Sequence, residues 1–328
     1  MNRLWCFLLP FAVANLLCAN DLVDIYRTKG IGAAEERIND MLRSRVYWLD
    51  KLDQQDTRFG YFEEPKKTLF VVDKTAASFA VYSYENGKLT ANGTHKATLG
   101  DAQGDKFVEG DKKTPVGTYK ITSLLTSQAN KLDPYYGPLA YTTNYPNYLD
   151  KKLGKSGHGI WIHGFPLNGA RNNENSEGCV VIDNDLLRSL QTSVQTDQIV
   201  VMINENGVLE ASKDDIAAVL ATIFQWRWVW KNNDISAYLA LYAEDFKRSD
   251  GLNRVKFDTA KRQIFARRDK KVIELTDIEV VPYPNSQGQT IFRVRFWQNY
   301  EAASHKSSRV KELYVRKQND QFAIIMEH

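Results

Sequence analysis

The segment HGIWIHGFPLNGARNNENSEGCVVIDN, residues 158–184, contains the pattern on which the prediction of the fold depends. Two short runs rich in β-branched residues, IWI and CVVI, are separated by a polar stretch that contains Gly and Asn. Such runs, bounded by turn-forming residues, are typical of short buried strands. We therefore expect two strands here, with Cys179 at the start of the second.

Alternating patterns extend from this segment in both directions. TLFVVDKTAASFAVYSYENGKLT (68–90) predicts two strands around a turn near 74–76, and its NG pair, residues 86–87, predicts a further hairpin. An alternating strand begins at Gly117, a short helix is expected near 184–193, and QIVVMI (198–203) predicts a final strand. The intervening segments, 133–157 and 166–178, are expected to be long loops. Residues 67–203 thus form a mainly β domain.

The flanking regions have different patterns. Residues 20–62 contain apolar positions at helical spacing, with breaks expected at Gly30 and Gly32. Such a short segment cannot form its own core, so we expect it to pack on the next domain or to form a homodimer with a second copy. After a linker at 204–215, the sequence predicts helices over 216–248 and three or four strands within 272–326. Residues 211–328 are therefore expected to form an α+β unit.

The composition bears on compartment and partners. The 328 residues have a formal charge of only +3, and basic residues are not clustered with aromatic ones, so no nucleic-acid surface is predicted. Residues 1–19 have the layout of a secretory signal peptide, which predicts a periplasmic protein without a stable membrane span after leader removal. Removal of the leader eliminates Cys6 and Cys18, which leaves Cys179 as the only thiol.

A lone cysteine is either a small buried hydrophobe or a nucleophile. A nucleophile needs an imidazole to accept its proton and backbone donors for an oxyanion. Strand parity places Trp161 and His163 on the face opposite Ile160 and Ile162, so His163 is the candidate base if the isoleucines face the core. His158 then belongs to the rim. Gly178 permits a tight bend that can aim the 178–179 amides at an oxyanion. These residues alone leave both interpretations of Cys179 open.

The two motifs together resemble a known family. Cys179 of SEGC lies 16 residues after His163 of IHG, and EGDKKTPVGTYKI (109–121) precedes both. This combination is similar to the YkuD-type L,D-transpeptidases and L,D-carboxypeptidases of bacterial peptidoglycan, which have a β-sandwich with long loops. The resemblance implies that Cys179 is the nucleophile, that His163 is the base, and that the carbonyl of Gly164 orients His163. It further implies an oxyanion hole at the 178–179 amides, and no cofactor or metal.

The residues around the motifs are expected to contact the stem peptide. The family often has His and Arg where this chain has Glu177 and Val181, so the donor contacts here are expected to differ. Ser176 matches the motif serine and is expected to form hydrogen bonds within its loop. The candidate substrate-binding residues, from the motifs and the adjacent loops, are Trp161, His158, Ser176, Glu177, Lys131, Tyr141 and Arg171.

The three-part organisation resembles the cell-shape L,D-carboxypeptidases of helical and curved Gram-negative bacteria, with a C-terminal unit like nuclear transport factor two. The resemblance implies a thiol peptidase that removes the terminal D-alanine from tetrapeptide stems. An L,D-transpeptidase and a non-catalytic wall-binding scaffold are alternatives. A zinc peptidase is disfavoured because His158 and His163 lack a third ligand at a recognisable spacing. Trp226, Trp228 and Trp230 are expected in the core and interfaces rather than in a ligand cage.

Overall fold

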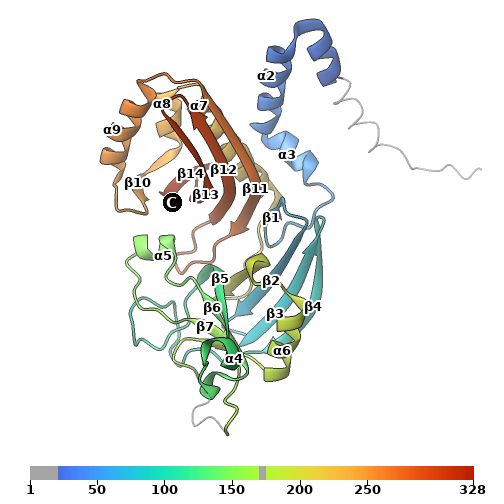
Figure 1. Ribbon diagram of the computed structural model, residues 1–328, viewed down its shortest axis with the longest axis vertical. Coiled ribbons are helices and arrows are strands. Elements are labelled where there is room, and N and C mark those ends of the chain that lie inside the picture. The colour runs from blue at the N-terminus through green and yellow to red at the C-terminus, as the bar shows by residue number, and fades with distance from the viewer. Residues whose placement is uncertain (1–20, 170–174) are drawn as a thin grey trace, which may run out of the picture.

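The computed structural model describes residues 21–169 and 175–328, so the predicted leader and Arg171 lie outside the described residues. A mainly β central domain and an α+β C-terminal domain lie end to end along the long axis, and the N-terminal helices lie beside the C-terminal domain (Figure 1). This organisation confirms the expected fold class.

Eight strands form the central domain in the order β4-β3-β2-β9-β5-β6-β7-β8. They are β2 (Lys66–Asp73), β3 (Ser78–Glu85), β4 (Lys88–Lys96), β5 (Gly117–Thr126), β6 (Leu139–Thr143), β7 (Trp161–His163), β8 (Val180–Val181) and β9 (Ile199–Asn204). Strand β5 pairs with β9 through residues 117–120 and with β6 through residues 121–126. The expected sandwich is therefore built from one continuous sheet that curls at β5.

The centre of this sheet is buried on both faces. Phe70 and Val201 belong to the core of the central domain, whereas Leu69 and Val200 on the opposite face pack towards the C-terminal domain. Burial on both faces explains the nearly continuous apolar runs of β2 and β9. The NG turn between β3 and β4 also forms as expected, because residues 86 and 87 both adopt positive φ.

The region 133–157 differs from the expected loop. It contains the 3-10 helix η1 (Pro134–Tyr136), strand β6 and helix α5 (Tyr148–Lys152). The other short helices of this domain are α4 (Ser127–Asn130), α6 (Asn184–Ser193) and the 3-10 helix η2 (Thr196–Gln198). Strand β6 has only five residues, LAYTT, and its pairing with β5 and β7 rather than its own pattern makes it a strand.

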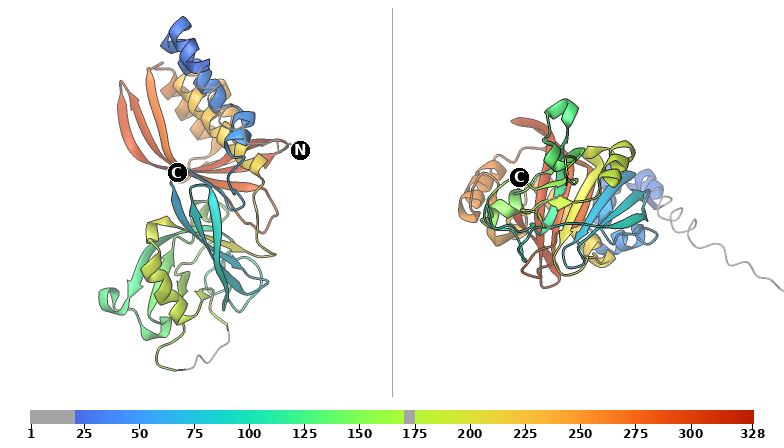
Figure 2. Two further views of the ribbon diagram at one scale, coloured as in Figure 1. Left: turned by 90° about the vertical axis from the view of Figure 1, so that its right-hand side faces the viewer. Right: turned by 90° about the horizontal axis from the view of Figure 1, so that it is seen from below.

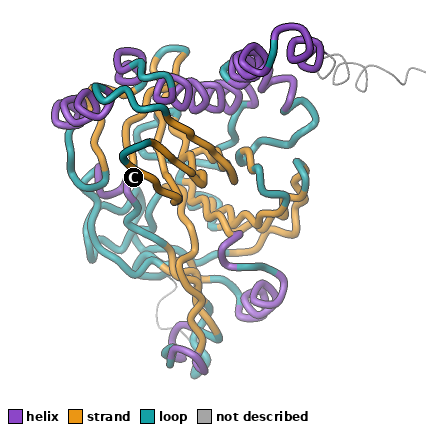
Figure 3. The backbone as a smooth tube through the Cα atoms, turned by 45° about the horizontal axis from the view of Figure 1, so that its top comes forward, coloured by secondary structure: helices purple, strands orange, loops and turns teal. Residues whose placement is uncertain are grey.

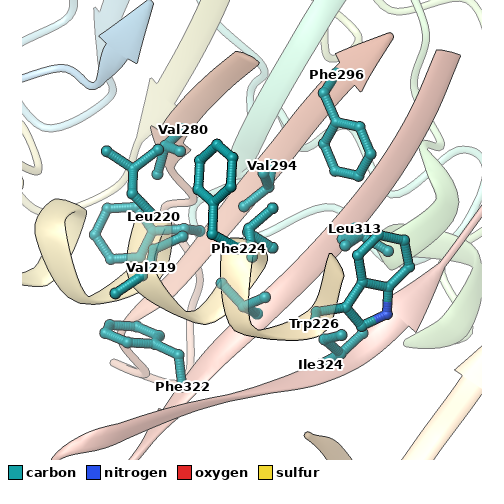
Figure 4. Close-up of a cluster of buried hydrophobic side chains, with 14 of the residues drawn as sticks. Val219, Leu220, Phe224, Trp226, Val280, Val294, Phe296, Leu313, Phe322 and Ile324 are labelled. Atoms are coloured by element: carbon teal, nitrogen blue, oxygen red, sulfur yellow. The ribbon is translucent and has the colours of Figure 1, made fainter. Parts of the chain in front are cut away.

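The C-terminal domain has a six-stranded sheet in the order β1-β11-β12-β13-β14-β10. Its strands are β1 (Tyr61–Phe62), β10 (Tyr242–Arg248), β11 (Lys271–Pro282), β12 (Ile291–Ala302), β13 (His305–Gln318) and β14 (Gln321–Glu327), and its helices are α7 (Lys213–Lys231), α8 (Ile235–Ala240) and α9 (Arg254–Phe265). Helix α7 lays Leu220 and Phe224 on the sheet residues Val280 and Val294 (Figure 4). The expectation of helix through residue 248 was wrong at its end, because residues 242–248 pair with β14.

The N-terminal helices pack on the C-terminal domain. Residues 21–29 are helical, and helices α2 (Ile31–Leu42) and α3 (Arg45–Lys51) follow. Gly30 breaks the first helix with φ 84°, whereas Gly32 lies inside α2. The ring of Trp48 in α3 stacks on Phe224 with centroids 5.4 Å apart. The two helices run alongside α7 (Figure 2), so helices from both ends of the chain gather around the C-terminal domain (Figure 3).

Buried charges join the two large domains. Lys67 of β2 contacts Glu279 of β11 at 2.5 Å, and both side chains are at most 4% exposed. Burial alone would raise the pKa of Glu279, but the cations of Arg293 and Lys67 hold that pKa below its usual value. The pair belongs to a larger group of charges, because Glu64 also contacts Lys67, and Arg293 and Arg295 also contact Glu279. The contact between Lys67 and Glu279 therefore joins the two domains at a buried position.

Candidate active site

Strands β7 and β8 bring the two motifs together. They pair in parallel, with Ile162 opposite Val180 and His163 opposite Val181. Ile160 and Ile162 belong to the core of the central domain. Because side chains alternate along a strand, Trp161 and His163 point to the opposite face, as the parity of the sequence predicts.

Cys179 lies one residue before β8 and is half-buried. Its Sγ accepts a hydrogen bond from the backbone N–H of Trp161 at 3.4 Å and donates to the carbonyl of Gly159 at 3.3 Å. Continuation of the strand register places Cys179 beside Trp161, on the side of the sheet that carries His163. Backbone atoms of β7 and of the residues before it thus fix the position of the sulfur.

His163 is held by its neighbours in a defined tautomer. Its ring is almost fully buried, and Nδ1 lies 2.9 Å from the carbonyl oxygen of Gly164. A carbonyl can only accept, so Nδ1 carries the proton and Nε2 has the lone pair that a general base needs. The contact expected between Gly164 and His163 is therefore present.

The turn before Cys179 is closed by Ser176. Its hydroxyl donates to the carbonyl of Cys179 at 2.6 Å and accepts from the N–H of Gly178 at 3.1 Å. Ser176 therefore forms the expected hydrogen bonds within the loop. The expectation for Gly178 needs correction, because in this conformation its amide serves the turn and is not directed at an oxyanion. The oxyanion role of the Cys179 amide stays a prediction.

Gly178 has a steric role instead. Its φ is 128°, and a Cβ at this position would lie 2.7 Å from the carbonyl oxygen of Lys113. The turn packs against the loop that contains Lys113 and the TPVG motif, 114–117, because no side chain intervenes. Thr114 of that loop, fully buried, accepts from the N–H of Gly100 through its hydroxyl at 2.9 Å.

Tyr136 covers the site and was missed by the sequence analysis. Its ring centroid lies 4.9 Å from that of Trp161 and 5.1 Å from that of His163. Burial, and then the nearby Cys179, raise the pKa of Tyr136. A Cβ on Gly137 would lie 2.7 Å from the Cα of Gly164, so the PYYG turn, 134–137, sits directly on the IHG motif. This turn contacts IHG from a distant part of the sequence, so a local pattern could not predict the contact. The only signal in the sequence was the abundance of aromatic residues near the motif.

The other expected substrate-binding residues have different positions. His158 and Glu177 are exposed at the rim, 3.6 Å from Glu109 and 3.8 Å from Lys112 respectively. Lys131 is exposed at the C-terminal end of α4.

Tyr141 does not belong to the site, and its assignment as a substrate-binding residue was wrong. It lies in β6 opposite Ile162 and therefore points into the core, where it is 1% exposed and packs on Phe70. Its hydroxyl has no hydrogen-bond partner among the described residues, and burial raises its pKa to about 12. Val181, at the position where the family often has Arg, is also fully buried.

A cavity of about 690 Å³ lies in the C-terminal domain. Lys261 lines it with Arg267 and Arg309, and its Nζ lies 4.9 Å from the ring centroid of Trp230. Burial lowers the pKa of Lys261 to about 8, and neighbouring cations add to this effect against the attraction of Glu327.

Two residues that line this cavity have a buried donor atom without a partner among the described residues. These atoms are Nε1 of Trp230 and Nε2 of Gln298. Trp226 is a core residue, and the guanidinium of Arg43 covers Trp228 at 4.5 Å. Of the three tryptophans, Trp230 alone lines this cavity.

The described residues show two further features of the chain. Within 21–169 and 175–328, no three side chains among His, Cys, Asp and Glu are arranged to hold a metal ion. No helix in these ranges is both long enough and apolar enough to span a membrane.

Comparisons with known proteins agree with both domains. Residues 67–202 match the L,D-transpeptidase catalytic domain, YkuD, and residues 218–328 match the Cds6 C-terminal NTF2-like domain. The helical cell shape determining protein Pgp2 from Campylobacter jejuni is 37% identical, with a TM-score of 0.80, over 87% of this chain and 99% of that chain. Bd1075 from Bdellovibrio bacteriovorus is 27% identical, with a TM-score of 0.66, over 83% and 96% of the two chains. No curated protein sequence matches the chain.

The family follows from the agreement between motif, geometry and similarity. The matched catalytic domain contains Cys179, His163, the TPVG loop and the curled sheet. The chain therefore belongs to the YkuD family of L,D-transpeptidase catalytic domains and carries a C-terminal NTF2-like domain of the Cds6 type.

Proposed function

We propose that the protein is a periplasmic L,D-carboxypeptidase that removes the terminal D-alanine from tetrapeptide stems of peptidoglycan and thereby affects cell shape. The observation that carries the proposal is the pairing of β7 with β8, which places Cys179 and His163 on one side of the sheet with the tautomer of His163 fixed. The similarity to a helical cell shape determining protein over most of both chains supports the same conclusion.

The chemistry proceeds through a thioester. His163 Nε2 takes the proton of Cys179, and the sulfur attacks the carbonyl carbon of the meso-diaminopimelate residue. The C–N bond to D-alanine breaks, and the proton on His163 passes to the leaving amine. Water then loses a proton to His163 and attacks the thioester, which releases the tripeptide stem and restores the thiol. The N–H of Trp161, 3.4 Å from Sγ, stabilises the thiolate before the attack.

Incubation with purified muropeptides tests this proposal. We expect the wild-type protein to convert tetrapeptide stems to tripeptides with release of one D-alanine, and Cys179→Ala to be inactive. Cross-linked dimers without tripeptides would identify a transpeptidase instead. A wild-type protein that leaves all muropeptides unchanged, while both it and Cys179→Ala restore cell shape, would identify a non-catalytic scaffold.

The leader and the oligomeric state belong to the same proposal. Cleavage after residue 19 would deliver the protein to the periplasm, and N-terminal sequencing of the exported protein tests this. The N-terminal helices still expose Val23, Ile31 and Val46 after packing on the C-terminal domain, which favours a homodimer through these helices. Val46→Glu is expected to shift the sedimentation coefficient towards the monomer, and a wild-type protein that already sediments as a monomer would contradict the dimer.

We further propose that the C-terminal cavity binds a carboxylate-bearing part of the wall polymer. Lys261, Arg267 and Arg309 line the cavity, and their charged donors are suited to a carboxylate. Calorimetric titration of Cys179→Ala with purified stem peptide measures this binding without turnover. Lys261→Met is expected to weaken the binding by about tenfold or more, and an unchanged affinity would contradict the assignment.

A further inference from the structure

One side chain of the C-terminal domain reaches into the interior of the central domain. Tyr283 follows β11 and is fully buried. Its hydroxyl donates to Asp150 Oδ1 at 3.1 Å and accepts from Asn147 Nδ2 at 2.9 Å. Asn147 and Asp150 form a reciprocal cap at the start of α5, so Tyr283 completes the hydrogen bonding of a buried helix start.

Asp150 belongs to a buried group of charges. Lys155 contacts Asp150 at 3.0 Å and Asp105 at 2.8 Å, and no side chain of the three is more than 4% exposed. Burial raises the pKa of Asp150 against the opposing effect of Lys155. Two carboxylates thus share one ammonium group, and the hydroxyl of Tyr283 supplies a further donor to Asp150.

Asp105 anchors the first of two loops beside the nucleophile. It accepts from the N–H of Val116 at 2.8 Å and thereby closes the loop 105–116. This loop supplies the carbonyl of Lys113 against which Gly178 packs. A displacement of Asp105 would therefore move the loop 105–116, which supports the turn before Cys179.

Lys155 anchors the second loop. Only three residues separate it from Gly159, whose carbonyl accepts from the sulfur of Cys179 at 3.3 Å. The N–H of Ser156 donates to the carbonyl of Phe107 at 2.8 Å, which ties this loop to the first. Both loops around Cys179 therefore start from one buried ion-pair cluster.

We propose that Tyr283 is a positioning residue for the active site: its hydroxyl fixes Asp150, and through Lys155 and Asp105 it sets the two loops that hold Cys179. The C-terminal domain thus takes part in the geometry of the catalytic centre. The effect on turnover rests on the proposed function, whereas the effect on the reactivity of Cys179 does not.

Tyr283→Phe tests this role with the smallest change of shape. The ring remains, but Asp150 loses a donor and Asn147 loses an acceptor. Tyr314→Phe is the matched control, because Tyr314 is also fully buried, its ring lies 5.6 Å from that of Tyr283, and its hydroxyl donates to Glu312 within the C-terminal domain. Tyr283→Phe therefore removes hydrogen bonds to the central domain, whereas Tyr314→Phe removes one within the C-terminal domain.

The first measurement is the rate of alkylation of Cys179 by iodoacetamide as a function of pH, followed by mass spectrometry of the Cys179 peptide in the full-length protein. We expect Tyr283→Phe to change the rate at neutral pH by about fivefold or more and to shift the pH profile, because the environment of the sulfur is displaced. Tyr314→Phe is expected to stay within about twofold of wild type. A wild-type profile for Tyr283→Phe, or equal changes in both variants, would overturn the proposal.

The second measurement is turnover of tetrapeptide muropeptides. Tyr283→Phe is expected to lower kcat by about tenfold with little change in KM, because the loops position the sulfur rather than bind the substrate. If the wild-type protein alkylates normally but does not release D-alanine, the proposed function fails and the alkylation result still decides the role of Tyr283.

The third measurement covers the case in which Tyr283→Phe does not fold. Asp150→Asn keeps the shape of the side chain and weakens its contact with Lys155, and it is expected to shift the alkylation profile in the same direction. A folded Asp150→Asn protein with a wild-type profile would also contradict the proposal.

Discussion

The site at Cys179 and the cavity at Lys261 are built in different ways. At Cys179, main-chain atoms determine the geometry: strand pairing, the carbonyl of Gly164 and the N–H of Trp161 place the sulfur and the imidazole. At Lys261, long charged and aromatic side chains surround an open volume, and buried donors of two lining residues have no partner among the residues that the structure describes.

This difference matches the two tasks that we propose for the sites. A nucleophile must be held within a fraction of an ångström of one geometry, which rigid backbone provides. A binding cavity gains affinity from polar groups that are satisfied only when a ligand arrives. Three substitutions and one change of pH test this comparison, and their expected effects decrease in the order given below.

The largest effect is expected for Cys179→Ala. Release of D-alanine should fall by at least about 10³-fold, because Cys179 is the only thiol in residues 21–169 and 175–328 that could form the thioester. Calorimetric binding of stem peptide at the C-terminal cavity should be unchanged. Loss of both properties together would show that the two sites are not separable in the way the structure indicates.

Gly178→Ala tests the role of the backbone at the catalytic site. The added Cβ would clash with the carbonyl of Lys113 at an unfavourable φ of 128°, so turnover is expected to fall by about 10²-fold. Gly207→Ala is the control, since Gly207 also has a positive φ, of 83°, but has nothing within 4 Å. Similar losses in both variants would point to a general effect of φ rather than to the contact with Lys113.

The pH dependence of binding probes the cavity. Below its pKa of about 8, Lys261 is charged and attracts a carboxylate, and above that pKa it becomes neutral. Affinity for stem peptide in the Cys179→Ala background should therefore weaken by up to about tenfold between pH 7 and pH 9, while arginines stay charged. Calorimetry at several pH values measures this change, and Lys261→Met should abolish it. A flat profile for the protein with Lys261 would exclude this lysine as the ligand's partner.

The smallest effect is expected for Tyr141→Phe. The hydroxyl is buried without a partner among the described residues, so its removal should leave turnover unchanged and alter the free energy of unfolding by less than about 1 kcal/mol. Tyr119→Phe is the comparison, because the buried hydroxyl of Tyr119 donates to the carbonyl of Val116 at 3.2 Å and its loss should cost about 1 kcal/mol. Denaturant unfolding measures both values. A drop in turnover for Tyr141→Phe would show that this residue contributes to substrate binding after all.

The sequence predicted the elements with a strong local pattern. The hairpins before residue 96, the strand from Gly117, helix 184–193 and the last strand of the central domain all form where the period of apolar residues places them. Elements without such a pattern were missed. Strand β6 lies inside an expected loop, β10 lies at the end of the expected helical region, and α9 follows that region. Because β6 was not predicted, strand parity could not be applied to Tyr141, and its side chain was assigned to the wrong side of the sheet.

The sequence by itself determined the residue types that can perform the chemistry, their spacing, and the face on which His163 lies. These follow from local periodicity, which records whether a side chain is buried or exposed within one strand. Only the tertiary structure decided which distant groups meet: Tyr136 over His163, the cations around Trp230, and Tyr283 against Asp150, 133 positions away. The period of a strand specifies a face but not the partner that covers it, and that choice depends on how whole sheets and domains pack.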